Sequence, residues 1–118
     1  MAWRPLRPGV YRDMAQPTIS IQKSGAVTWN ESAHRALGQP DSVEIQFDEE
    51  RKLLGLRRTG EGENSFRVRR LGTQNTWITS ARGALRRVGL LPDSAHRRPA
   101  QRENDLLVIV VSELLEGR

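Results

Sequence analysis

The sequence predicts a small, β-rich α+β protein made of two degenerate copies of one strand-strand-helix-hairpin unit. Three observations lead to it. Short segments alternate apolar and polar residues, two brief helical patterns each end at a glycine, and the same order of elements occurs in residues 18–58 and again in 65–114. The chain has 118 residues, near the size of one domain, so we expect residues 18–114 to fold cooperatively.

The first unit is predicted over residues 18–58. Ile19 and Ile21 alternate with polar neighbours, which is typical of a half-buried strand. Asn30 is a good N-cap for a short helix, and Gly38 can take the left-handed conformation that ends one. The predicted elements are strands at 18–21, 26–29, 43–47 and 53–58 and a helix at 31–37.

The second unit follows a glycine- and glutamate-rich linker at residues 59–64. Phe66 and Val68 alternate with arginines, which predicts one strand, and residues 76–79 predict another. We expect Ser80 to cap a helix that ends at Gly89. Its apolar positions are Ala81, Ala84, Leu85 and Val88.

The two units match without a gap across the strand and helix at their centres. Val27-Thr28, Ala33, Leu37 and Gly38 correspond to Ile78-Thr79, Ala84, Val88 and Gly89, each at an offset of 51 positions. Further along, residues 48–51 correspond to residues 102–105 after an insertion at 90–94. Pro99 then falls in a strand, which we expect to be an edge strand or to contain a bulge.

Residues 1–17 are predicted to form a flexible basic arm, because prolines and arginines alternate there without strand or helix periodicity. Met14 is an alternative start. Cysteine is absent, and no apolar run is long enough to span a bilayer. We therefore expect a soluble, cytoplasmic protein that does not enter a membrane.

The formal net charge is +5, and it is unevenly distributed along the chain. Residues 65–102 contain nine arginines and the single acid Asp93, whereas residues 41–64 have a net charge of −3. Such a two-sided charge distribution favours an anionic partner for the basic part.

The order and identity of several residues resemble the AbrB, MazE and MraZ superfamily of swapped-hairpin proteins. The likeness is carried by Gly25-Ala26-Val27-Thr28, Ala36-Leu37-Gly38, Asp41, Val43-Glu44-Ile45 and Leu54-Gly55-Leu56-Arg57. The resemblance implies two ββαββ-type repeats that form a swapped-hairpin-like barrel with two short helices. It also implies a small transcriptional regulator that binds duplex DNA as a homodimer or higher homo-oligomer.

The candidate DNA contacts are basic residues in the turn of the first unit and in the second unit. Strand alternation predicts that Arg67 and Arg69 share one face, and Arg82 and Arg86 stand four apart on one helix, where an anion would relieve their repulsion. Guanidinium groups suit phosphate oxygens and guanine edges. The predicted nucleic-acid-binding residues are Lys23, Arg67, Arg69, Arg70, Arg82, Arg86 and Arg87.

Three alternatives remain open for these residues. The arginines can pair internally with the acids of residues 41–64 or simply be solvated. They can also belong to a protein-interaction module, antitoxin-like or a scaffold, whose basic face binds an acidic partner. RNA is the third alternative, and Lys23 can be an ordinary solvated turn residue.

No catalytic, cofactor or metal site is predicted. There is no nucleophile elbow, phosphate loop or carboxylate pair in a recognisable context, and neither His34 nor His96 has a partner at metal-ligand spacing. We therefore do not expect an enzyme. Trp29 and Trp77 precede the two helices, where core packing is favoured over stacking on nucleobases, while Trp3 lies in the arm.

Overall fold

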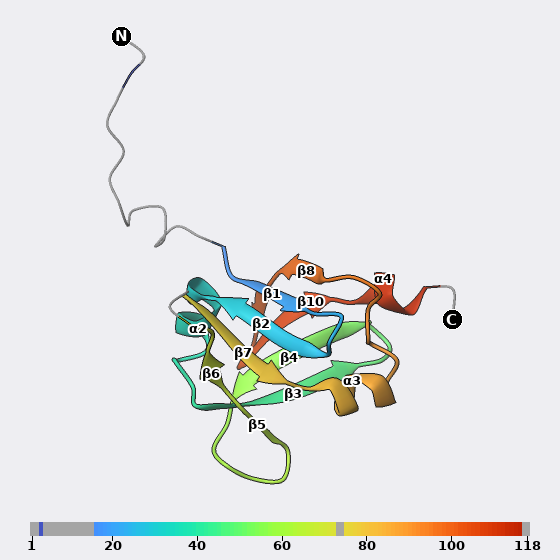
Figure 1. The fold of residues 1–118 in the computed structure, drawn as a ribbon, viewed down its shortest axis with the longest axis horizontal. Helices are drawn as coiled ribbons and strands as arrows, with labels where there is room; N and C mark the ends of the chain where they lie inside the picture. The colour runs from blue at the N-terminus through green and yellow to red at the C-terminus, as the bar shows by residue number, and fades with distance from the viewer. Residues whose placement is uncertain (1–2, 4–15, 73–74, 117–118) are drawn as a thin grey trace.

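The computed structural model describes residues 3, 16–72 and 75–116, so most of the predicted N-terminal arm lies outside the described residues. The described part is a β-rich α+β fold with three short helices (Figure 1). In chain order its elements are β1 (Thr18–Ile21), β2 (Ala26–Asn30), α2 (Glu31–Ala36), β3 (Ser42–Asp48), β4 (Leu53–Arg58), β5 (Ser65–Arg67), β6 (Arg69–Arg70), β7 (Thr76–Ser80), α3 (Arg82–Arg87), β8 (His96–Pro99), β9 (Gln101–Glu103), β10 (Leu106–Val110) and α4 (Ser112–Leu115).

The strands form two five-stranded sheets. Sheet A has the order β6-β7-β2-β1-β8, and sheet B has the order β5-β3-β4-β10-β9. All the strand pairs are antiparallel. Neither sheet of the described chain closes on itself, so the predicted barrel is not confirmed.

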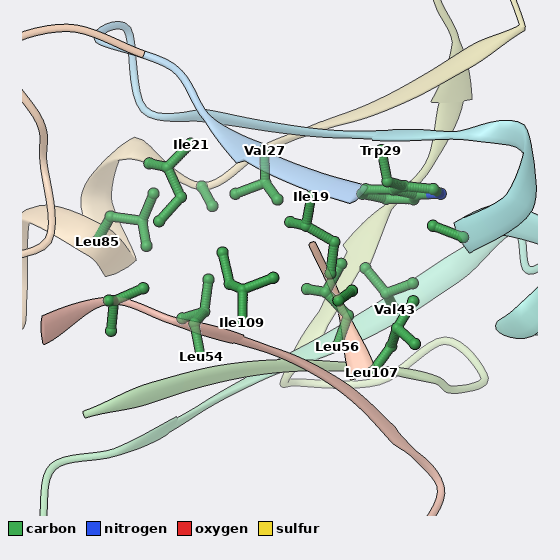
Figure 2. Close-up of a cluster of buried hydrophobic side chains, with 14 of the residues drawn as sticks. Ile19, Ile21, Val27, Trp29, Val43, Leu54, Leu56, Leu85, Leu107 and Ile109 are labelled. Carbon is green, nitrogen blue, oxygen red and sulfur yellow. The ribbon is translucent and has the colours of Figure 1, made fainter. Parts of the chain in front are cut away.

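One apolar core lies between the two sheets (Figure 2). Ile19, Val27 and Trp29 point into it from sheet A, and Leu54 and Ile109 point into it from sheet B, each no more than 2% exposed. Burying one such side chain contributes about 1.5–3 kcal/mol. The core therefore joins residues of both predicted units into one packed layer.

The chain crosses from one sheet to the other at two places. Val68 separates β5 of sheet B from β6 of sheet A, and its amide donates a hydrogen bond to the Asp41 carbonyl at 2.9 Å. Ala100 separates β8 of sheet A from β9 of sheet B, and its amide donates to the Pro17 carbonyl at 2.8 Å. The single strand predicted around Val68 is therefore wrong. Pro99 does lie in an edge strand, β8, as predicted.

Helix α2 forms as the sequence predicts. The Asn30 side chain accepts a hydrogen bond from the Ala33 amide at 3.0 Å, and Gly38 has a φ of 84° after the helix. Ala33 and Leu37 pack into the core. The capped start and left-handed end thus fix a short helix whose apolar side covers one end of the sheets.

Helix α3 differs from its prediction at both ends. Ser80 does not cap it, because Ser80 pairs with Ala26 as the last residue of β7 and Ala81 takes the N-cap position without a side-chain hydrogen bond. Within the helix only Leu85 is buried, while Ala84 is exposed and Val88, just after it, is 41% exposed. The i, i+3, i+4, i+7 pattern therefore predicted more buried residues in this helix than the structure has.

The turn between β1 and β2 supports the start of α3. Gly25 has a φ of 89°, and a Cβ atom placed there would lie 2.5 Å from the Arg82 Cα atom. The Ala81 amide donates a hydrogen bond to the Gly25 carbonyl at 3.1 Å. Only glycine permits both the left-handed backbone and this close approach.

We predict that Gly25→Ala lowers the free energy of unfolding by about 2–4 kcal/mol, since it adds left-handed strain and a backbone overlap. Urea unfolding followed by circular dichroism measures this change. Gly60→Ala is the matched control, because nothing lies within 4 Å of a Cβ atom at that position. Equal stability of the two variants would contradict the close packing of the turn on α3.

Candidate nucleic-acid interface

All seven predicted contact residues are exposed, but they lie in four different elements of the fold. Lys23 lies in the β1–β2 turn, and Arg82, Arg86 and Arg87 belong to α3. Arg67 ends β5 in sheet B, whereas Arg69 and Arg70 form β6 in sheet A. The structure therefore does not bring all of them together.

The crossing at Val68 separates Arg67 from Arg69. In sheet B, Phe66 pairs with the buried Val43, so that pair faces the core. The next pair along the strands is Arg67 with Ser42. Because side chains alternate between the two faces of a sheet, Arg67 lies on the outer face of sheet B. In sheet A, Thr28 lies between the buried Val27 and Trp29 and therefore faces outward. Ile78 pairs with Thr28, and Arg69 pairs with Ile78, so Arg69 also lies on the outer face of sheet A. The prediction that these arginines share one face is wrong.

A row of directly paired residues crosses the outer face of sheet A and carries an arginine at each end. From β6 to β8, the five strands of sheet A each contribute one residue to this row, in the order Arg69, Ile78, Thr28, Ser20 and Arg97. The neighbouring outward positions are mostly polar. We define the sheet A outer face as Thr18, Ser20, Gln22, Ala26, Thr28, Asn30, Arg69, Thr76, Ile78, Ser80, Arg97 and Pro99. None of these positions is acidic.

Arg97 is the residue of this face that sequence reasoning missed. Its Nη2 atom donates to the Thr18 Oγ1 atom at 3.4 Å, so the side chain leans across β1. A shallow hollow of about 160 Å³ lies between Arg97 and the hydroxyl groups of Ser20 and Thr28. The only sequence signal for Arg97 was the excess of arginine in residues 65–102, because its place beside β1 depends on the sheet.

The β1–β2 turn that holds Lys23 contacts the start of α3 at one end of sheet A. The Arg82 Nη1 atom donates to the Ser24 carbonyl at 3.3 Å, which fixes the first turn of α3 against the turn that holds Lys23. Arg86 and Arg87 follow in the last turn of the helix. The fold thus places the turn that holds Lys23 next to the helix that carries three of the predicted arginines.

Two acids of residues 41–64, Glu44 and Asp48, form ion pairs with arginines that are not among the predicted contacts. Arg57 bonds to Glu44 and Asp105, and Arg51 bonds to Asp48 and Glu103. Hydrogen bonds from Gln46 and then Arg57 lower the pKa of the Glu44 carboxyl. In the described part of the chain, no ion pair engages Arg67, Arg69, Arg82, Arg86 or Arg87.

A stack of rings joins the core to the surface beside β6. Trp29 is buried, and its Nε1 atom donates to the His34 Nδ1 atom at 3.1 Å. The His34 ring lies 4.0 Å from the Trp77 ring at an angle of 9°, and the Arg70 guanidinium lies 5.8 Å from the Trp77 centroid. Both tryptophans thus pack in or against the core, as predicted.

The outer end of this stack borders a polar hollow of about 480 Å³ between α2 and β6, lined in part by Asp41, Arg69 and Asn75. The Arg70 Nη2 atom donates to the Asn75 Oδ1 atom at 2.6 Å. His34 thus covers one face of the Trp77 ring, and the Arg70 guanidinium lies near the same ring. The lining of this hollow therefore adds polar groups next to Arg69, and it does not indicate a particular chemical reaction.

Within residues 16–72 and 75–116, no three His, Asp or Glu side chains gather in a way that could hold a metal ion. No helix in the same residues has the length and apolar character needed to cross a membrane.

No family model matches the chain, and no curated protein or solved structure shows significant similarity to it. The resemblance to the AbrB, MazE and MraZ superfamily therefore stays a prediction.

His34 makes the stability of this region depend on pH. Burial lowers its pKa from 6.5, and the charge of Asp41 opposes that shift only in part. The unfolded chain therefore binds a proton at a higher pH than folded His34 does, so the unfolding free energy falls as the pH drops below about 6.5. Carboxylates titrate near pH 4, below this window.

We predict that His34→Gln flattens this dependence, because glutamine does not titrate. Urea unfolding at several pH values between about 7.5 and 5.5 measures the slope in both proteins. An equally steep slope in the variant would show that His34 is not its source.

Proposed function

We propose that the protein is a DNA-binding protein, a small transcriptional regulator, that contacts the phosphate backbone of duplex DNA through the sheet A outer face. The observation that carries the proposal is the row across sheet A, which has Arg69 and Arg97 at its ends and no acid between them. Lys23 and Arg82 add positive charge at the end of the same sheet.

The width of the row suits a DNA groove. Arg69 and Arg97 lie on the two edge strands of a five-stranded sheet, four strand spacings apart, which is about 19 Å between backbones. Arg97 leans inward over β1, so the two guanidinium groups can approach phosphates on both sides of a major groove about 12 Å wide.

The outer face beside the arginines supplies neutral donors. Within the row, Thr28 carries a hydroxyl group and Ser20 is only 9% exposed, while Thr18 and Thr76 lie next to the row on the same face. Such hydroxyl groups commonly bond to phosphate oxygens. Guanidinium groups at the two edges of the sheet and hydroxyl groups between them would bond to phosphate oxygens. Such contacts position a protein on DNA and are independent of base sequence.

We also propose that the chain contains two copies of one unit in a swapped-hairpin-like arrangement. Each of two central strands pairs with its own counterpart: β2 with β7, and β4 with β10. In the proposed repeat, β5 corresponds to β1 and β8 corresponds to β3. The pair of β1 with β8 is therefore the same contact as the pair of β5 with β3, with the two units exchanged. Such reciprocal pairing is what two equivalent units related by a two-fold axis would make.

The register of the central pair supports the same proposal. Val27 lies opposite Thr79 and Thr28 lies opposite Ile78, so the pairing is unchanged when each residue is exchanged for its counterpart 51 positions away. The crossings at Val68 and Ala100 join the two sheets along both edges, although neither sheet closes.

Arg67 is left out of the proposed interface, since it lies on the opposite face. The proposed phosphate contacts are Lys23, Arg69, Arg82 and Arg97, with Arg70, Arg86 and Arg87 at the two ends of the sheet.

We predict that duplex DNA binds with a log-log salt slope steeper than about −3.6, because four or more phosphates are contacted at about −0.9 each. Arg69→Ala and Arg97→Ala should each weaken binding and reduce the slope by about 0.9. Fluorescence anisotropy of a labelled duplex at several salt concentrations measures both quantities.

The matched control is Arg67→Ala, which removes the same charge two residues from Arg69 but on the other face, and should leave duplex affinity unchanged. Absence of duplex binding at low salt would refute the proposal. A preference for RNA of the same length would favour an RNA-binding role, and nuclease-resistant capture of an acidic protein without duplex binding would favour a protein-interaction module.

A further inference from the structure

The outer face of sheet B differs chemically from that of sheet A. Because Leu54, Leu56, Leu107 and Ile109 point into the core, their strand neighbours point outward. We define the sheet B outer strip as Leu53, Gly55, Leu106, Val108 and Val110. None of these residues belongs to the core cluster: Val110 is 49% exposed, Leu53, Leu106 and Val108 are half-buried, and Gly55 is buried. Beside the strip, the same face carries Glu44 paired with Arg57.

A depression lies in the centre of this strip. Gly55 sits in β4 opposite Val108, and a Cβ atom there would lie 3.2 Å from Leu106 and 3.3 Å from Val108. The glycine therefore makes room for Leu106 and Val108 of the same chain. A hollow of about 460 Å³ is lined by these residues and by the charged Glu49 and Glu50, and a second of about 250 Å³ shares Leu53 and Val108 with it.

Opposite charges lie at the two ends of the same face. Glu49 and Glu50 are exposed in the β3–β4 turn, and Arg67 is exposed beside Ser42 at the start of β3. Within the described residues, none of these three side chains takes part in an ion pair. They are separated by the seven residues of β3, about 20 Å.

We propose that the sheet B outer strip binds the same strip of a second copy of this chain, which forms a two-fold symmetric dimer. A two-fold axis in the plane of the interface and perpendicular to the strands reverses the strand direction. It therefore brings Glu49 and Glu50 of each copy toward Arg67 of the other and sets the two apolar strips against each other.

The available area indicates a weak dimer. The strands of sheet B have 3 to 7 residues each and 24 in all, which at about 3.3 Å per residue and about 4.8 Å between strands gives about 380 Å² per copy, or about 760 Å² in total. That total is below the size of stable specific interfaces and in the range of transient ones. The dimer should therefore dissociate on dilution, and both sheet A outer faces stay free, on opposite sides of the assembly.

The dimer is tested by sedimentation velocity on the full chain, without DNA, from low micromolar to several hundred micromolar protein. The wild type should shift from monomer to dimer as the concentration rises. Val108→Lys should be monomeric throughout, because it places a charge in the centre of the strip. Circular dichroism confirms that the variant is folded.

A charge exchange tests the symmetry. Glu49→Arg/Glu50→Arg alone and Arg67→Glu alone should each lose dimerisation, since like charges then face each other at both contacts. An equimolar mixture of these two variants should dimerise again, because both contacts become attractive. Glu61→Arg/Glu63→Arg, which changes two exposed acids of the 59–64 loop, should dimerise as the wild type does.

A wild type that stays monomeric at all concentrations would overturn the proposal, and so would dimerisation unaffected by Val108→Lys. Failure of the charge-exchanged mixture to associate would overturn the two-fold arrangement. The outcome is separate from DNA binding: monomeric Val108→Lys should retain the duplex affinity of a single chain, so the two proposals can fail independently.

Discussion

The burial of one apolar layer between two antiparallel sheets is the interaction on which the rest of this structure depends. Inward positions such as Ile19, Val27, Leu54 and Ile109 fill that layer. Because side chains alternate along a strand, the inward set also decides which residues face outward on each sheet. The chemistry of both surfaces thus follows from the packing of the core.

The two outer faces that result are different. Sheet A presents an acid-free row between Arg69 and Arg97, while sheet B presents an aliphatic strip on β4 and β10 beside the polar outward positions of β3. A single residue outside the ladders, Val68, produces part of this difference. It lets the chain leave one sheet and enter the other, so arginines two positions apart in sequence reach opposite faces.

The ends of the sheets are held by a few specific contacts. At one end α2 packs its apolar side on the core, and the ring stack of Trp29, His34 and Trp77 continues to Arg70 at the surface. Along the edges, the His96 Nε2 atom lies 3.0 Å from the Val110 carbonyl and joins β8 to β10. These contacts fix the position of the basic residues relative to the core, which a binding surface requires.

The sequence by itself determined the β-rich class, the first hairpin, helix α2 with its Asn30 cap and Gly38 end, and the edge position of Pro99, because these depend on local propensity and alternation. The tertiary structure alone decided where the chain changes sheets, that Ser80 belongs to β7, and that Arg97 joins Arg69 while Arg67 does not. Those outcomes depend on pairing between strands distant in sequence, and alternation within one segment does not specify which strands will pair.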